Sequence, residues 1–219
     1  MITFANRREA GRLLAERLAE YANRTDVTVL AIPRGGVPVA YEVARALSAQ
    51  LDVMLVSKVY APGRDDVQIG TIASGGFELL ETETIEARAI DPAIVGREMA
   101  RARQDLAYRE RLYRGMRPPL AIRDRTVIVI YDGIVTGALM RAAVAALRAG
   151  DAAHVIVATP VASPNARAEI ERIADACICV ATPQPVYRIG MWYEDFAPAT
   201  DASVLFLLDR ARTVSTVAA

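Results

Sequence analysis

Hydrophobic positions follow two patterns that alternate along the chain. Short, nearly continuous apolar runs rich in β-branched residues are typical of strands buried on both faces of a sheet. Longer segments with apolar residues three and four positions apart are typical of amphipathic helices. The predicted strands cover residues 27–32, 53–56, 127–130, 155–158 and 177–180. The predicted helices cover residues 6–21, 37–47, 92–113, 138–147, 165–173 and 202–211.

Strands that alternate with helices indicate right-handed β-α-β units. We therefore predict an α/β fold with a mostly parallel central sheet flanked by helices. Ligands of such sheets bind at the carboxyl ends of the strands. Residues 33–36 and residues 131–137 each follow a predicted strand and contain glycines, so both are candidate binding loops.

Residues 60–76 interrupt the alternation with a proline, several glycines and a run of charges. This composition predicts a long flexible loop, with a short hairpin around residues 69–72. Long loops in compact domains often carry function. The aromatic-rich segment 185–219 is predicted to form a hood and a C-terminal helix over the same site. Because the composition does not otherwise change, we expect a single domain over 1–219.

The overall composition narrows the class of protein. Of the 219 residues, 53% are hydrophobic and 24% are charged, a balance that excludes disordered and fibrous proteins. The 26 basic and 26 acidic residues cancel, which argues against nucleic acid as a partner. No apolar run reaches the roughly 18 residues of a membrane helix. With only two cysteines and no signal-peptide pattern, we expect a cytoplasmic protein. Whether the chain forms a homodimer is left open.

Lys58 is the only lysine among the 26 basic residues. It follows the predicted strand 53–56, so the pattern places it at the carboxyl edge of the sheet. There its compact ammonium group would supply a point charge for an anion. Chance in an arginine-rich chain explains a single lysine equally well, and the pattern leaves both interpretations open.

The strongest local motif covers residues 127–137. A buried strand delivers Asp132 to its carboxyl end, and a loop bracketed by Gly133 and Gly137 then opens a helix. Free N–H groups and the helix dipole favour an anion there, and Thr136 adds a hydroxyl group. Asp132, beside the anion, is placed for sugar hydroxyls or a metal. An ordinary strand-to-helix turn with a capping threonine would show the same pattern, so both interpretations stay open.

This segment resembles the phosphoribosyl pyrophosphate motif of type I phosphoribosyltransferases, in which an apolar run precedes two acids and a threonine- and glycine-rich loop. Other landmarks follow in the family's order. Residues 33–36 resemble the pyrophosphate loop, and Lys58 matches a basic position. Residues 60–76 stand where the family has its flexible catalytic loop, and residues 192–196 where it has a hood. The resemblance covers nearly the whole chain and is closest in kind to bacterial members of unknown substrate.

The resemblance implies transfer of the 5-phosphoribosyl group from phosphoribosyl pyrophosphate to a nucleobase-like nitrogen, within nucleotide metabolism and with Mg²⁺ as cofactor. The implied ligands are phosphoribosyl pyrophosphate or a nucleoside monophosphate. The implied catalytic residues are Asp132, Arg34, Lys58 and Arg64. The implied substrate-binding residues are Arg34, Gly35, Gly36, Lys58, Tyr131, Asp132, Gly133, Ile134, Val135, Thr136, Gly137, Trp192 and Asp195. Mg²⁺ would be held mainly by the substrate's pyrophosphate, with Asp132 as the candidate protein ligand.

Two departures from the family pattern define an alternative. Tyr131 stands in place of the first acid, and Leu139 stands where the family tends to have threonine or serine. Backbone donors survive both changes, while contacts to the ribose are reduced. The alternative is a catalytically weak or inactive regulatory protein that binds a nucleotide or phosphoribosyl pyrophosphate.

Overall fold

The computed structural model describes residues 3–217 and divides into two compact units. The first unit is built from residues up to Met54 and from Leu120 onward, and the second is Leu55–Pro119. The single domain over 1–219 that the sequence predicts stays a prediction. Among the helices of residues 3–217, none combines the length and the hydropathy that crossing a bilayer requires.

The first unit contains a five-stranded parallel sheet, which confirms the predicted α/β fold. Its strand order is β2-β1-β6-β7-β8. The strands are β1 (Val27–Ala31), β2 (Gln50–Val53), β6 (Thr126–Ile130), β7 (His154–Val161) and β8 (Ala176–Ala181). Every residue of β1 and β6 is buried, as the continuous apolar runs predict. In this register Ala31 pairs with Ile130, so the loops that follow the two strands start side by side.

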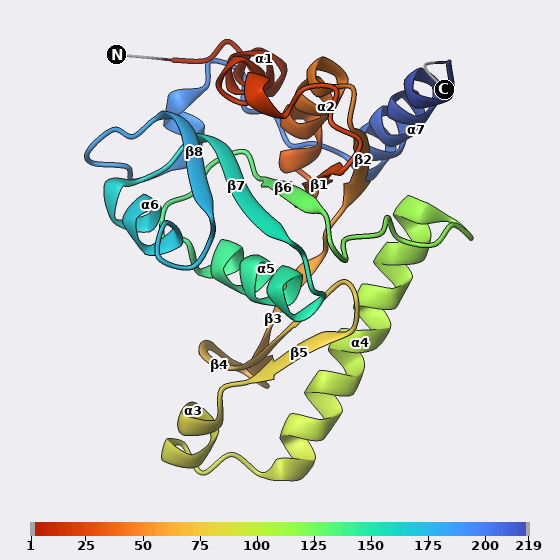
Figure 1. Cartoon of the computed structure of the whole chain (residues 1–219). Helices are drawn as coiled ribbons and strands as arrows, with labels where there is room; N and C mark the ends of the chain where they lie inside the picture. The colour runs from red at the N-terminus through yellow and green to blue at the C-terminus, as the bar shows by residue number, and fades with distance from the viewer. Residues whose placement is uncertain (1–2, 218–219) are drawn as a thin grey trace. The chain divides into compact units, whose positions relative to one another are not determined.

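Helices cover both faces of this sheet (Figure 1). One face carries α1 (Arg7–Arg17) and α2 (Gly36–Leu47), and the other carries α5 (Ala138–Ala149) and α6 (Pro164–Ile170). The C-terminal α7 (Asp201–Val217) packs on α2 and β2. Short 3-10 helices lie at η1 (Ala19–Tyr21) and η2 (Ile189–Trp192).

Local capping fixes where two of these helices begin. The side-chain oxygen of Asn6 accepts hydrogen bonds from the N–H groups of Arg8 and Glu9, at 3.0 and 3.1 Å. Ser163 caps α6 in the same way, accepting from the N–H of Ala166 at 3.1 Å. Such caps satisfy N–H groups that have no partner within the helix. The first turn of α1 is therefore set by its own sequence.

The prediction of one strand over residues 53–56 is wrong. Strand β2 ends at Val53, and the next strand begins at Val56 and belongs to the second unit. Lys58 consequently lies inside that later strand, paired with Thr71, and is not a residue of the central sheet. The apolar run continues through Met54 and Leu55, so hydrophobicity alone carries no sign that the chain leaves the sheet there.

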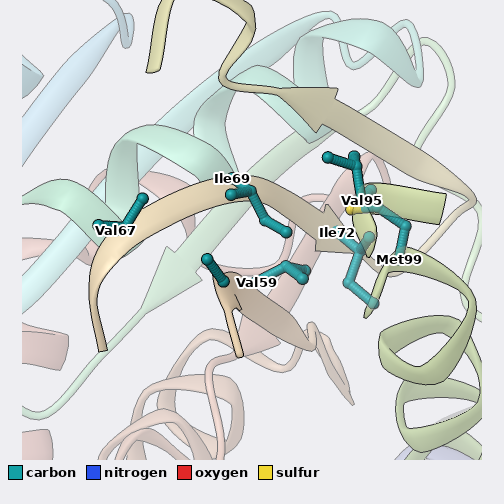
Figure 2. Close-up of a cluster of buried hydrophobic side chains, with 7 residues drawn as sticks. Val59, Val67, Ile69, Ile72, Val95 and Met99 are labelled. Atoms are coloured by element: carbon teal, nitrogen blue, oxygen red, sulfur yellow. The ribbon is translucent and has the colours of Figure 1, made fainter. Parts of the chain in front are cut away.

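The prediction of a loop over residues 60–76 is also wrong. The second unit contains an antiparallel sheet of β3 (Val56–Ala61), β4 (Arg64–Ala73) and β5 (Phe77–Leu80), followed by α3 (Thr82–Ala87) and α4 (Pro92–Arg114). Val59 of β3 and Val67, Ile69 and Ile72 of β4 form a core with Val95 and Met99 of α4 (Figure 2). Gly63, at φ 69°, supplies a left-handed turn residue between β3 and β4. The glycines mark the ends of the hairpins. The charged residues at the start of β4 hide the alternation of buried and exposed positions that indicates a strand.

Candidate functional site

The carboxyl ends of β1 and β6 approach each other closely through two glycines. A Cβ atom on Gly35 would lie 2.0 Å from Oδ2 of Asp132, and one on Gly36 would lie 2.7 Å from the carbonyl oxygen of Ile130. Both distances are far below a van der Waals contact, so only glycine fits at either position. The peptide bond before them, between Pro33 and Arg34, is cis. The structure thus brings the predicted pyrophosphate loop against the predicted phosphoribosyl loop.

The loop at residues 131–137 is held by the end of β7. The N–H of Ile134 donates to the carbonyl of Val161 at 2.9 Å. Ser163 donates its hydroxyl to the carbonyl of Val135 at 2.6 Å and its N–H to the carbonyl of Ile134 at 2.9 Å. These bonds fix the carbonyl groups of the loop toward the sheet.

The N–H groups of the same loop are left free. Within residues 3–217, no acceptor is hydrogen-bonded to the backbone N–H groups of residues 135–140. Gly137, at φ 71°, turns the chain into α5, and Thr136 is exposed beside it. A run of free donors at the start of a twelve-residue helix is the arrangement that binds phosphate groups.

Asp132 is buried and forms an ion pair with Arg7, which lies 125 residues earlier in the sequence. Nε of Arg7 donates to Oδ2 of Asp132 at 2.8 Å, and the two side chains are only 11% and 8% exposed. Burial raises the pKa of the Asp132 carboxyl, while the hydrogen bond and the charge of Arg7 lower it. The phenol of Tyr131 is neutral at pH 7, and burial and the nearby Asp132 charge raise its pKa further.

An aromatic cluster from the predicted hood covers Asp132. The hydroxyl of Tyr193 donates to the backbone carbonyl of Asp132 at 2.6 Å, and burial raises the pKa of this phenol. The Tyr193 ring packs between Phe4 and Phe196, with centroids 5.4 and 4.9 Å away. Trp192 is half-buried against the same cluster. Tyr193 is therefore buried in the packing of the hood, and its ring is not available to stack on a base.

Arg34 and Asp195, two further predicted residues of the first unit, lie at the surface. Arg34 is exposed, with Nη1 3.9 Å from Oδ2 of Asp201 in a loose ion pair. Asp195 is exposed, and its Oδ1 accepts a hydrogen bond from the N–H of Ala197 at 2.9 Å. The guanidinium group of Arg34 is thus available to an anion, as pyrophosphate binding requires.

Lys58 and Arg64 belong to the second unit. Lys58 is half-buried in β3, and Arg64 is exposed at the start of β4, just after the turn at Gly63. Within the described part of the chain neither side chain forms an ion pair. Their assignment to pyrophosphate and to a closing lid stays a prediction.

Sequence reasoning missed Arg7 and Ser163. Arg7 lies in the first turn of an amphipathic helix, where a charged residue is ordinary, so no local signal distinguishes it. Ser163 has a signal, because Ser163-Pro164 after a predicted strand is a typical helix start. Its carboxyl-edge position would have placed it beside the loop of residues 131–137.

Comparison with known proteins agrees with this geometry. Residues 4–189 match the family described as phosphoribosyl transferase domain. The chain is 35% identical, over 211 residues, to proteins from two strains of Mycobacterium tuberculosis that are named putative phosphoribosyl transferases. The match covers 96% of this chain and 47% of each relative, so the chain spans about half the length of the curated relatives it matches.

One solved structure supports the fold at higher similarity. The crystal structure of TT1426 from Thermus thermophilus is 40% identical, with a TM-score of 0.81, and the match covers 94% of this chain and 98% of that one. The family match extends over most of the chain, from before α1 into η2, and includes both glycine-bearing loops. The chain belongs to the phosphoribosyl transferase domain family.

Proposed function

We propose that the chain transfers the 5-phosphoribosyl group from phosphoribosyl pyrophosphate to a nucleobase-like nitrogen acceptor. The observation that carries this proposal is the run of free N–H groups over residues 135–140, directly beside the buried carboxylate of Asp132. Free backbone donors suit a 5-phosphate, and a carboxylate next to them suits a sugar hydroxyl. Membership of the phosphoribosyl transferase domain family supports the same assignment.

In the proposed reaction an acceptor nitrogen forms a bond to C1 of the ribose as the bond from C1 to the pyrophosphate oxygen breaks. Pyrophosphate leaves with the electron pair, and the acceptor's proton passes to solvent. The chain would contribute positioning and charge stabilisation. Residues 133–137 would hold the 5-phosphate, and Arg34 with Gly35 and Gly36 would hold the pyrophosphate. Lys58 and Arg64 would add positive charge to the leaving group, and Trp192 and Asp195 would contact the acceptor.

The protein side chains fit a magnesium ion that arrives with the substrate. Within residues 3–217, no three His, Cys, Asp or Glu side chains gather as a metal site. Asp132 is the one acid of its loop, and its pairing with Arg7 disfavours a direct bond to a cation. Mg²⁺ commonly binds through substrate phosphates and retained waters with one or two protein carboxylates. When bound, Mg²⁺ would neutralise charge on the departing pyrophosphate.

A second candidate, regulatory binding of a nucleotide or phosphoribosyl pyrophosphate with little or no turnover, is favoured by Tyr131 and Leu139. Tyr131 is a neutral phenol where the family has an acid, and Leu139 removes a hydroxyl group from the start of α5. Both changes would weaken contacts to the phosphorylated sugar without touching the backbone donors.

Two measurements test the proposal and separate the candidates. Crystals soaked with ribose 5-phosphate should show its phosphate at residues 133–137, and filling of a different site would overturn the assignment. Pyrophosphate release from phosphoribosyl pyrophosphate with Mg²⁺ should then be followed across a panel of purine and pyrimidine bases. Release that depends on one base supports the transferase, whereas binding without release by any base supports the regulatory candidate.

A further inference from the structure

One of the two carboxylate oxygens of Asp132 is already in use. Nε of Arg7 donates to Oδ2 at 2.8 Å, and both side chains are nearly buried. Ion pairs at the surface are worth little because water competes for both partners. Here the carboxylate is shielded from water, so the loss of its partner would leave a buried charge uncompensated. The Arg7–Asp132 pair is therefore a fixed part of the site.

Arg7 is held in place from its other side as well. Its Nη1 donates to the carbonyl of Ala197 at 2.8 Å, and its Cζ atom lies 3.8 Å from the centroid of the Phe196 ring. A guanidinium group at this distance over an aromatic face is attracted electrostatically. Because the Asn6 cap also fixes the first turn of α1, the guanidinium cannot swing away from Asp132 without breaking several contacts.

The other oxygen of the carboxylate remains open. Oδ1 of Asp132 receives no hydrogen bond from any other residue within residues 3–217. The Asp132 side chain keeps 8% of its surface exposed, so the carboxylate is not sealed off from a ligand. A free carboxylate can accept hydrogen bonds through both oxygens, for example from two neighbouring hydroxyl groups. Asp132 has one such oxygen left.

We propose that Arg7 determines the sugar specificity of the site: by holding Oδ2 of Asp132, it restricts this acid to one hydroxyl of a pentose 5-phosphate instead of the 2,3-diol. The proposal rests on the proposed function, because it takes residues 133–137 as the 5-phosphate site. It makes Arg7 a positioning residue that acts through Asp132. The site would then accept a pentose 5-phosphate that lacks one of its hydroxyls at C2 and C3.

The test compares ribose 5-phosphate with its 2-deoxy and 3-deoxy analogues by calorimetric titration. In the natural chain, loss of one hydroxyl should weaken binding at least about tenfold and loss of the other less than about twofold, as expected for one hydrogen bond to a charged acceptor. In Arg7→Met, which frees Oδ2, both deoxy analogues should bind more weakly than ribose 5-phosphate. Arg7→Lys keeps a cation beside Asp132 and should preserve the natural one-hydroxyl pattern. The same titrations on Tyr131→Phe show whether the hydroxyl of Tyr131 contributes to the differences in affinity between the three sugars.

Arg8→Met is the matched control. Arg8 is the next residue of α1 and pairs with Glu42 at 3.1 Å from an exposed position, so its loss should leave all three affinities unchanged. Equal weakening by both deoxy analogues in the natural chain would overturn the proposal, as would Arg7→Met weakening all three sugars by one common factor. If Arg7→Met does not fold, the titrations of the natural chain and of Arg7→Lys test the proposal. Both should show the one-hydroxyl pattern. If the natural chain binds none of the three sugars, the proposed function fails and takes this inference with it, whereas binding without the one-hydroxyl pattern refutes the role of Arg7 alone.

Discussion

Gly35 leaves no space for a side chain beside Asp132. A Cβ atom at this position would lie 2.0 Å from Oδ2 and 2.6 Å from Cγ of the aspartate. The carboxylate cannot move aside freely, because Arg7 holds Oδ2 through a hydrogen bond. The loop after β1 and the acid after β6 therefore share one small volume, and both fit only because residue 35 has no side chain.

Gly35→Ala should lower the free energy of unfolding by about 1–3 kcal/mol, the usual effect of overpacking a filled site. It should also weaken ribose 5-phosphate binding, because the clash displaces Asp132. Urea denaturation and calorimetric titration would measure the two effects. Gly96→Ala is the control: Gly96 lies within α4 with nothing within 4 Å of an added Cβ, so the change should stabilise the chain by about 0.5–1 kcal/mol. Unaltered stability of Gly35→Ala would show that the two loops are not in contact in solution.

Tyr193→Phe should lower the melting temperature by about 2–8 °C, corresponding to about 1–2 kcal/mol for a chain of this size. The hydroxyl of Tyr193 is buried and donates to the carbonyl of Asp132, so its removal leaves that acceptor without its donor. Tyr187→Phe serves as the control, since Tyr187 is 76% exposed. Calorimetric melting of both variants checks the prediction, and equal melting temperatures would count against a structural bond from Tyr193.

Tyr131→Asp should raise pyrophosphate release by about 30-fold or more, by analogy with a charged contact made mainly in the transition state. The natural phenol is neutral at pH 7, and burial and the Asp132 charge raise its pKa still further above that pH. An acid there would respond to positive charge that develops on the sugar. Tyr131→Asn introduces a side chain that has the shape of aspartate without its charge. It is the matched control and should not accelerate release. A fast natural enzyme that Tyr131→Asp slows would refute this interpretation.

Lys58→Met should weaken phosphoribosyl pyrophosphate at least about tenfold while leaving adenosine monophosphate binding nearly unchanged, since hydrogen bonds to charged groups have this strength. Lys58 is half-buried in β3 and forms no ion pair within the described residues, so its charge is available for a ligand. Lys58→Arg keeps the charge and should lose less affinity. Parallel titrations with the two ligands give the comparison, and an equal loss for both would assign Lys58 to the fold.

Continuous apolar runs predicted the central sheet well because a strand buried on both faces has little choice of residues. The runs at residues 27–32 and 127–130 appear as β1 and β6, with every strand residue buried. The same rule failed at residues 53–56, where one apolar run serves two different sheets. It failed again over residues 60–76, because the charged start of β4 at Arg64 hides the alternation of Val67 and Ile69.

The candidate site could be predicted where its residues follow one another in sequence, and not where distant residues meet. Residues 131–137 could be found because a strand, a glycine loop and a helix follow one another in sequence. Arg7 could not, because its partner Asp132 lies 125 residues away and only the folded sheet and hood bring the two together. Tyr193 was assigned to the hood from its position, but the pattern of aromatic residues could not distinguish a ring that stacks on a ligand from one that packs on Phe4 and Phe196.

The pairing of Phe4 with the hood sets an order of assembly. The N–H of Phe4 donates to the carbonyl of Trp192, and the N–H of Glu194 donates to the carbonyl of Phe4. When the chain has emerged from the ribosome only as far as Ala181, all five strands of the parallel sheet are present. Tyr193 and Phe196, whose rings cover Asp132, are not yet present. Because chains emerge from the N-terminal end, the acid stays open to water until the hood segment arrives. Newly made molecules should therefore have a formed sheet before Asp132 is covered.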